Sequence, residues 1–186
     1  MINVTELRPG NYFIDEGKLY QAIHILLNKT AMRKMVAKVK VKNLRTGAII
    51  ELARNSGYGV EDVHIDKKVM QYLYDTGETL CFMDGKTYEQ IELPKNNLEH
   101  EIPFLAPNSE VTIISYDDEV LGVQLPAKAI LTVTECEPGV RGDTISNGGS
   151  KDAILETGMK IRVPLFINQG DKIAVDTTTG KYDGRA

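Results

Sequence analysis

The amino-acid sequence predicts an all-β protein, because strand and turn signals dominate it and helical signals are few. Short segments of alternating apolar and polar residues are separated by Gly and Asp, which is typical of small β-barrels or sandwiches. Hydrophobic residues make up 42% of the 186-residue chain, enough for a core in one large domain or in two or three small ones. Three barrels of about 60 residues fit better than one large sheet, since strands average about 5–6 residues.

Turn signals and composition shifts place the expected domain boundaries. We expect domains over residues 1–62, 63–126 and 127–186, with seams near residues 61–66 and 124–129. No apolar run is long enough to span a bilayer, and the start of the chain does not resemble a signal peptide. We therefore expect a cytoplasmic protein that does not contact a membrane.

Two hairpins are expected in the first half of the chain. Residues 11–26 read as two strands joined through residues 15–17. Residues 79–93 read as a second hairpin around Asp84-Gly85, a dipeptide whose tolerance of positive φ suits a tight turn.

The last part of the chain repeats this pattern. Residues 163–182 predict strands joined by turns at residues 169–171 and at Thr179-Gly180. Pro164 lacks a backbone donor, so we expect it on an edge strand or at a bulge.

One short helix is expected between strands. In residues 96–105, Asn96 or Asn97 is a suitable N-cap, and Pro103 would end the helix.

Charge is divided unevenly along the chain. Residues 1–62 carry 10 Lys+Arg and 6 Asp+Glu, residues 63–126 carry 4 and 12, and residues 127–186 carry 8 and 8. From Lys29 to Arg45 there are seven basic residues and no acidic one, although the net charge of the chain is −4. This asymmetry predicts that the amino-terminal part meets a polyanion.

The basic segment contains a strictly alternating strand pattern over residues 35–42. The apolar face holds Met35, Ala37, Val39 and Val41, and the opposite face holds Lys38, Lys40 and Lys42. Residues 24–27 are the expected partner strand, with residues 28–34 as the turn. Such a cationic arm suits insertion between phosphate backbones. Lysines on an exposed strand face also serve solubility and discourage edge pairing, which is the competing interpretation.

Patterns typical of catalysis or metal binding are missing from the sequence. Three histidines occur singly: His24, His64 and His100. Three neighbouring acids favour a turn over a cation site: Asp117, Asp118 and Glu119. Residues 142–149 are Gly-rich but lack the lysine–threonine pair and helix of a phosphate loop. We expect no enzyme, no cofactor and no metal.

Eight short motifs stand in a specific order and spacing. They are RPG (8–10), KVKNLRTG (40–47), MQYLY (70–74), FMDGKTYEQ (82–90), PGVRGDT (138–144), LETG (155–158), VPLFINQGDKIAVDT (163–177) and TGKY (179–182). Together they make the chain resemble the bacterial elongation factor P family along nearly its whole length.

The resemblance implies a fold and a function. The fold is an SH3-like (KOW-type) barrel followed by two OB-fold barrels, in an L-shaped arrangement like transfer RNA. The function is binding to the ribosome between the P and E sites, beside the peptidyl-tRNA, to promote peptide-bond formation at consecutive prolines. The implied partners are both ribosomal subunits, ribosomal RNA and peptidyl-tRNA, and the implied state is a monomer. The alternative is a diverged RNA-binding barrel protein without this role.

The implied site lies at both ends of the chain. The loop tip facing the peptidyl-transferase centre would contain Lys29, Met32, Arg33 and Lys34. The RNA-binding residues would be Lys38, Lys40, Lys42, Arg45, Gly142, Asp143, Thr144, Tyr182 and Arg185. For Gly142, Asp143 and Thr144, a simple Gly-rich turn is the competing interpretation.

The loop tip departs from the family pattern. Many members carry Pro-Gly-Lys-Gly there, with a modified lysine, and another group carries a modified arginine. Gapless alignment from both sides puts Met32 at the modified position, with Thr30 and Ala31 before it. Either the loop works unmodified, with Arg33 and Lys34 supplying charge, or it is wound so that one of these two is modified. We favour the first interpretation, because both flanks fix the alignment.

A second departure follows residues 142–144. The segment 145–158 is one residue longer than the usual form, and Asp152 stands where proline is common.

Overall fold

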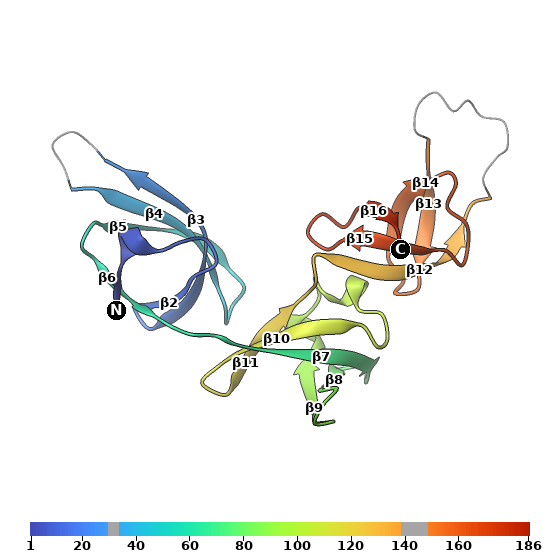
Figure 1. Cartoon of the computed structure of the whole chain (residues 1–186), viewed down its shortest axis with the longest axis horizontal. Coiled ribbons are helices and arrows are strands. Elements are labelled where there is room, and N and C mark those ends of the chain that lie inside the picture. The colour runs from blue at the N-terminus through green and yellow to red at the C-terminus, as the bar shows by residue number, and fades with distance from the viewer. Residues whose placement is uncertain (30–33, 139–148) are drawn as a thin grey trace. The chain divides into compact units, whose positions relative to one another are not determined.

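The protein is nearly all-β in a computed structural model that describes residues 1–29, 34–138 and 149–186 (Figure 1). The strands are β1 Ile2–Asn3, β2 Tyr12–Asp15, β3 Lys18–Asn28, β4 Val36–Asn43, β5 Ile49–Asn55, β6 Gly59–Asp62, β7 Asp66–Asp75, β8 Thr79–Met83, β9 Gln90–Pro94, β10 Glu110–Tyr116, β11 Glu119–Gln124, β12 Lys128–Cys136, β13 Ser150–Leu155, β14 Lys160–Pro164, β15 Lys172–Asp176 and β16 Tyr182–Arg185. Three single-turn 3₁₀ helices accompany them: η1 Val4–Glu6, η2 Lys95–Asn97 and η3 Ile102–Phe104. The predicted fold class is confirmed.

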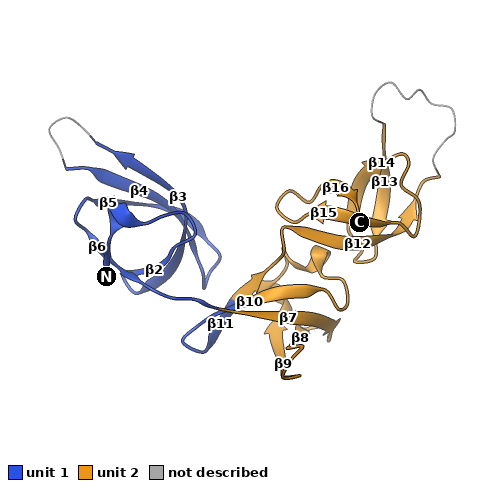
Figure 2. Ribbon diagram, in the orientation of Figure 1, with its two compact units in different colours: residues 1–66, 114–121 blue, residues 67–113, 122–186 orange. Residues whose placement is uncertain are grey.

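The chain forms two compact units (Figure 2). The first contains residues 1–66 and 114–121, and the second contains residues 67–113 and 122–186. Each of the three sheets uses one continuous stretch of chain. The boundaries drawn at residues 62 and 126 stay predictions. Across the described ranges, no helix is long and apolar enough to cross a membrane.

The first unit is built on a six-stranded sheet with the order β1-β6-β2-β3-β4-β5. Antiparallel pairing joins β3 to β4 and β4 to β5 over most of their lengths. The sheet encloses a core to which β2, β3, β4 and β6, together with residues 4–7, contribute buried side chains: Val4, Leu7, Phe13, Tyr20, Ala22, Ala37, Val39, Val41 and Val60. The ring of Phe13 packs against Tyr20 at 5.8 Å between centroids, so the base of the arm is fixed by aromatic contact.

The β10–β11 hairpin tip belongs to this first unit. Ile114, Tyr116 and Leu121 pack against a small buried cluster formed by Leu19, Leu44 and Ile65. The acids Asp117 and Asp118 form the turn itself, with φ of 50° and 63°. The turn interpretation of this acidic segment is therefore confirmed.

The second unit is built on two five-stranded sheets, one of which extends its β10–β11 tip, residues 114–121, into the first unit. Their orders are β11-β10-β7-β8-β9 and β14-β13-β12-β15-β16. The first sheet covers a core that includes Met70, Leu80 and Phe82. The second covers a core whose fully buried members include Leu131, Val163 and Ile173. Alternate residues of β12 to β15 supply that core, because successive side chains of a strand face opposite sides.

Most predicted turns are confirmed, with one correction. Glu16 and Gly17 form the β2–β3 turn, and Gly170 and Gly180 have φ of 89° and 70° in the two later turns. Pro164 ends β14, an edge strand in the hydrogen-bonding order of its sheet, as predicted.

The tight turn predicted at Asp84-Gly85 is wrong in detail. The β8–β9 hairpin exists, but its loop covers residues 84–89, and the positive φ of 59° falls on Tyr88. The Asp84 carboxylate accepts hydrogen bonds from the backbone N–H groups of Lys86 (2.7 Å) and Thr87 (3.4 Å). The aspartate therefore acts through its side chain, which stabilises a wider turn.

The predicted helix after residue 95 is also wrong. Instead of one capped helix, the chain forms η2 and η3, and neither has a side-chain N-cap hydrogen bond. Pro94 holds the N-cap position of η2, so Asn96 and Asn97 lie inside the turn, and Pro103 lies inside η3. Burial of Leu98 and Phe104 in the cores of the second unit overrides the capping preference.

Asp84 makes the stability of the second unit depend on pH. The Lys68 ammonium, 2.9 Å from the Asp84 carboxylate, is the main cause that holds the pKa of Asp84 well below its usual range. The hydrogen bonds from the backbone N–H groups of Lys86 and Thr87 lower this pKa further. A carboxyl with a depressed pKa stabilises the fold above its unfolded pKa of about 4 and loses this contribution as pH falls. We expect Asp84→Asn to lower the unfolding temperature at pH 7, with the difference from wild type shrinking below pH of about 4. Thermal unfolding at several pH values measures this, with the exposed Glu110→Gln as control. A pH-independent difference would contradict it.

Candidate nucleic-acid interface

The lysine pattern of the sequence lies on β4, the strand between β3 and β5. Ala37, Val39 and Val41 are almost completely buried, as the alternation predicted. Lys38, Lys40 and Lys42 are exposed on the other face. Residues 24–27 pair with β4 as expected, with Asn28 opposite Val36. We call these three lysines the lysine face.

The strands on both sides determine what surrounds the lysine face. On β3, Leu26, His24 and Gln21 stand opposite Lys38, Lys40 and Lys42. On β5, Ala53, Glu51 and Ile49 stand opposite the same three lysines. Directly opposed side chains in an antiparallel pair point to the same face of the sheet. The lysine face is therefore a cationic row flanked by two half-exposed apolar side chains, Leu26 and Ile49.

Glu51 is an acidic neighbour that the linear sequence did not reveal. It stands opposite Lys40, and its Oε1 lies 3.7 Å from the Nζ of Lys38. Both side chains are well exposed, so this ion pair contributes little to folding. Its main effect is to reduce the positive potential of the row. The cross-strand register, which the sequence alone does not give, would have been needed to find it.

The expected loop tip is partly described. Lys29 follows β3 and Lys34 precedes β4, and both are exposed. The structure brings these two lysines to the same end of the β3–β4 hairpin as Lys38. Met32 and Arg33, together with Thr30 and Ala31, lie outside the described residues.

Arg45 is held away from the lysine face by an ion pair. Its guanidinium donates to the Glu119 carboxylate at 3.0 Å, within the first unit. Asn43 stabilises the turn that follows β4, because its side-chain oxygen accepts a hydrogen bond from the backbone N–H of Arg45. Arg45 therefore joins the β10–β11 hairpin tip to the six-stranded sheet. It is less available to an outside phosphate than the three lysines are.

The remaining site residues belong to the second unit. Gly142, Asp143 and Thr144 lie outside the described residues. Tyr182 and Arg185 are the first and last residues of β16. Tyr182 packs against the core, while the Arg185 guanidinium donates to Asp171 at 3.0 Å and lies 5.2 Å from the centre of the Phe166 ring.

A buried polar cluster supports β5, and sequence reasoning missed it. Asp15, only 3% exposed at its side chain, accepts from Arg54 at 2.8 Å and from the Tyr58 hydroxyl at 2.8 Å. The Arg54 guanidinium also lies 5.1 Å from the centre of the Tyr58 ring. Burial alone would lower the pKa of Arg54, but the charge and hydrogen bond of Asp15 outweigh it and raise that pKa. The hydrogen bond to Asp15 raises the pKa of Tyr58.

This cluster joins three separate segments of the first unit. Asp15 ends β2, Arg54 lies on β5 opposite Ala37 of β4, and Tyr58 precedes β6. It therefore helps to hold β5 in register beside β4, the strand that carries the lysine face. We call Asp15, Arg54 and Tyr58 the polar brace.

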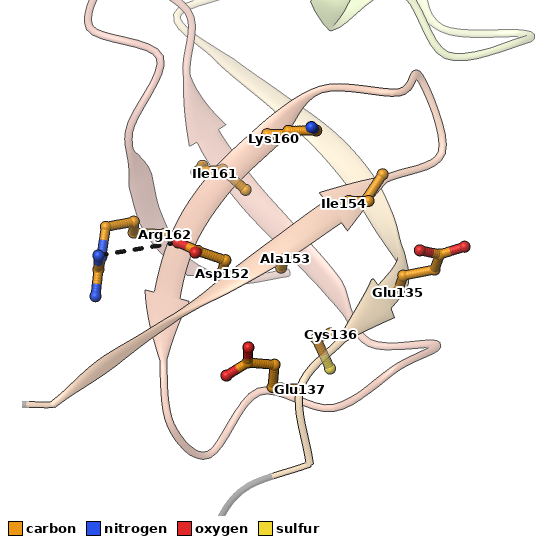
Figure 3. Close-up of a pocket in the computed structure, with 9 residues that line it drawn as sticks. All are labelled: Glu135, Cys136, Glu137, Asp152, Ala153, Ile154, Lys160, Ile161 and Arg162. Carbon is orange, nitrogen blue, oxygen red and sulfur yellow. Dashed lines mark ion pairs between the residues drawn. The ribbon is translucent and has the colours of Figure 1, made fainter.

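A depression of about 610 Å³ lies on the outer face of β12, β13 and β14 (Figure 3). Its charged lining residues are Glu135, Glu137, Asp152, Lys160 and Arg162. Arg162 reaches Asp152 at 3.9 Å. With three acids against two bases, this surface is not suited to bind a polyanion.

Three family models match successive parts of the chain. They are described as the elongation factor P KOW-like domain over residues 3–58, the elongation factor P OB domain over residues 65–123 and the elongation factor P C-terminal domain over residues 130–185. The lysine face lies in the first match, and β16 lies in the third.

Similar proteins carry the same family name. An elongation factor P of Mesoplasma florum is 47% identical, and one of Mycoplasma mycoides subsp. mycoides is 45% identical, each over 100% of both chains. Among solved structures, eukaryotic translation initiation factor 5A from Methanococcus jannaschii is 25% identical with a TM-score of 0.51. That match covers 66% of this chain and 92% of the solved one.

Proposed function

Because the chain belongs to the elongation factor P family of translation factors, we propose that it binds the ribosome between the P and E sites and promotes peptide-bond formation where consecutive prolines stall translation. It contacts the peptidyl-tRNA and ribosomal RNA of both subunits. The observation that carries this proposal is the lysine face, a concentrated positive surface on a chain whose net charge is −4.

The lysine face lies along the phosphates of the tRNA acceptor stem. Ammonium groups on a strand are spaced about 6.6 Å apart at alternate positions, because a strand rises about 3.3 Å per residue. This spacing is comparable to that of successive phosphates along one strand, so Lys38, Lys40 and Lys42 each neutralise one phosphate and release its counterions. The acidic middle segment makes no such contact and discourages nonspecific RNA binding.

The β3–β4 hairpin points its loop at the peptidyl-transferase centre. Lys29 and Lys34 supply charge at the base of the loop, and Met32 and Arg33 approach the CCA end. The loop works without a modification at Met32, since a thioether accepts neither of the family's modifications. A flexible apolar side chain fits an irregular surface well.

Acceleration comes from positioning alone. The ribosome supplies the reacting groups, and the protein holds the CCA end so that the ester carbonyl lies in attack geometry. Correct orientation of two reactants is worth several orders of magnitude in rate, even without a catalytic group. At the other end of the chain, Gly142, Asp143, Thr144, Tyr182 and Arg185 face the small subunit.

A stalled-ribosome assay tests this function. In a reconstituted translation system that lacks any such factor, adding the protein should relieve arrest at a run of three prolines and leave a proline-free message unchanged. A folded protein that gives no relief would contradict the proposal. It would favour a diverged RNA-binding protein, consistent with the unusual sequence at residues 30–33.

A further inference from the structure

One aromatic side chain of the second unit is placed unlike the others of its kind. The chain has four phenylalanines, of which Phe13, Phe82 and Phe104 are at most 5% exposed. Phe166 is 57% exposed, and its neighbour Leu165 is 38% exposed. Exposing a phenylalanine ring to water is unfavourable relative to burying it. A lone exposed ring needs no function, so the surroundings of Phe166 decide what it does.

Several contacts hold the turn that carries Phe166. Ile167 is fully buried in the core, and its backbone N–H donates to Pro164 O at 3.1 Å. The Asn168 side-chain amide donates to the carbonyl of Phe166 itself at 3.4 Å. The Leu165 side chain fills the space beside Gly149, where an added Cβ would lie 2.8 Å from it. The ring of Phe166 is therefore displayed on a preformed turn.

Arg185 lies over one face of this ring. Its Cζ is 5.2 Å from the ring centre, and its terminal nitrogen donates to Asp171 at 3.0 Å. The Asp171 carboxylate also accepts from the backbone N–H of Asn168 at 2.9 Å. Hydrogen bonding from Asn168 and then from Arg185 lowers the pKa of Asp171, so this ion pair is formed at neutral pH. The guanidinium is held in place over one face of the ring, and 57% of Phe166 stays exposed.

We propose that the free face of Phe166 stacks on an unpaired base of RNA. Flat aromatic rings displayed on a rigid barrel bind single-stranded nucleic acid in this way, since every base offers a π-face. Arg185 positions the ring and continues the planar surface with its guanidinium. This inference rests on the proposed function, because a factor that works on the ribosome meets RNA with unpaired bases.

Charge distinguishes this site from the lysine face. The Arg185 charge is matched by Asp171, and the segment of residues 127–186 has equal numbers of basic and acidic residues. Stacking therefore carries the contact, and its salt dependence is shallow, whereas binding by the lysine face falls steeply with salt. A duplex has no unpaired base to offer and does not bind here.

The absence of tryptophan from the sequence provides a direct probe. Phe166→Trp creates a single tryptophan, whose fluorescence is quenched when a base stacks on it. The probe ligand is a ten-nucleotide RNA without self-complementarity, compared with the duplex of the same strand. We expect quenching by the single strand at both 50 and 200 mM salt and none by the duplex. The matched control is Tyr74→Trp, a half-exposed ring on β7 of the same unit, which should show no quenching. Equal quenching of the two variants, or no quenching of Phe166→Trp, would overturn the proposal.

Ribosome binding gives an independent test. Phe166→Leu keeps an apolar side chain but removes the aromatic face, and we expect affinity to fall roughly 5- to 150-fold, the range of one stacked base. Phe166→Trp should bind at least as tightly as wild type. If Phe166→Leu and Phe166→Trp weaken binding equally, a protein surface shaped for phenylalanine occupies the site, and the RNA assignment is wrong. If neither changes binding while the wild-type protein still relieves proline arrest, this inference fails and the proposed function stands.

Discussion

Replacing Lys38, Lys40 and Lys42 together with glutamine will weaken ribosome binding by about a hundredfold near 0.1 M salt, because three phosphate contacts and their counterion release are lost. The slope of log affinity against log salt should become shallower by up to about 3, one for each lysine. Glutamine keeps the strand pattern, so β4 should fold normally. Equilibrium binding to ribosomes at four salt concentrations measures both quantities.

A matched triple substitution separates local contacts from net charge. Lys18, Lys86 and Lys160 are exposed lysines away from the lysine face, and their replacement with glutamine removes the same total charge. This control should retain nearly all affinity and the wild-type slope. Equal losses in both variants would mean that the lysine face is only a solvated surface.

The opposite change should strengthen binding. Glu51→Gln removes the acidic side chain of β5 that pairs with Lys38 and stands opposite Lys40. We expect the affinity for ribosomes to rise about two- to fivefold, because Glu51 no longer competes with RNA for these lysines. This factor corresponds to the free energy of one exposed ion pair. An unchanged affinity would show that Lys38 and Lys40 do not reach phosphate.

Replacing Arg54 with methionine will destabilise the first unit by about 3 kcal/mol, because it leaves the buried Asp15 carboxylate without its cation. Hydrogen exchange of β4 and β5 amides measures this loss locally, which a whole-chain unfolding curve does not. Ribosome binding should weaken as well, since β5 no longer holds β4 in place.

A second substitution tests the cause. Asp15→Asn keeps an oxygen that accepts from the Tyr58 hydroxyl but removes the charge. The double variant Asp15→Asn, Arg54→Met should therefore recover most of the protection of β4 and β5 amides against hydrogen exchange that Arg54→Met loses. Arg162→Met is the control, because the Arg162 side chain is 69% exposed and its guanidinium lies 3.9 Å from the Asp152 carboxylate, so it forms no buried ion pair. If the double variant is no better than Arg54→Met alone, the stabilisation comes from packing and not from the ion pair.

The sequence allowed the strand pattern to be predicted but not the pairs that form across strands. Alternation over residues 35–42 was enough to assign the buried and charged faces of β4, because side chains in a strand alternate. Glu51 enters the lysine face only through the register of β4 with β5. Asp15, Arg54 and Tyr58 each have an unremarkable local sequence, and only the closed sheet brings them together.

The two wrong predictions have different physical origins. At Asp84 the side chain, and not a positive φ, forms the turn, so a dipeptide rule based on φ gave too short a loop. At Asn96 and Asn97 the capping preference was real but weak, and burial of the neighbouring Leu98 decided the local structure. The first error therefore comes from a local side-chain contact, and the second comes from nonlocal burial.

The most direct measurement is an electron cryomicroscopy map of the protein on a ribosome that carries a peptidyl-prolyl-tRNA. We expect β4 beside the acceptor stem, with the Nζ atoms of Lys38, Lys40 and Lys42 within hydrogen-bonding distance of phosphate oxygens. A bound protein whose three lysines point into solvent, away from any RNA, would contradict the central claim.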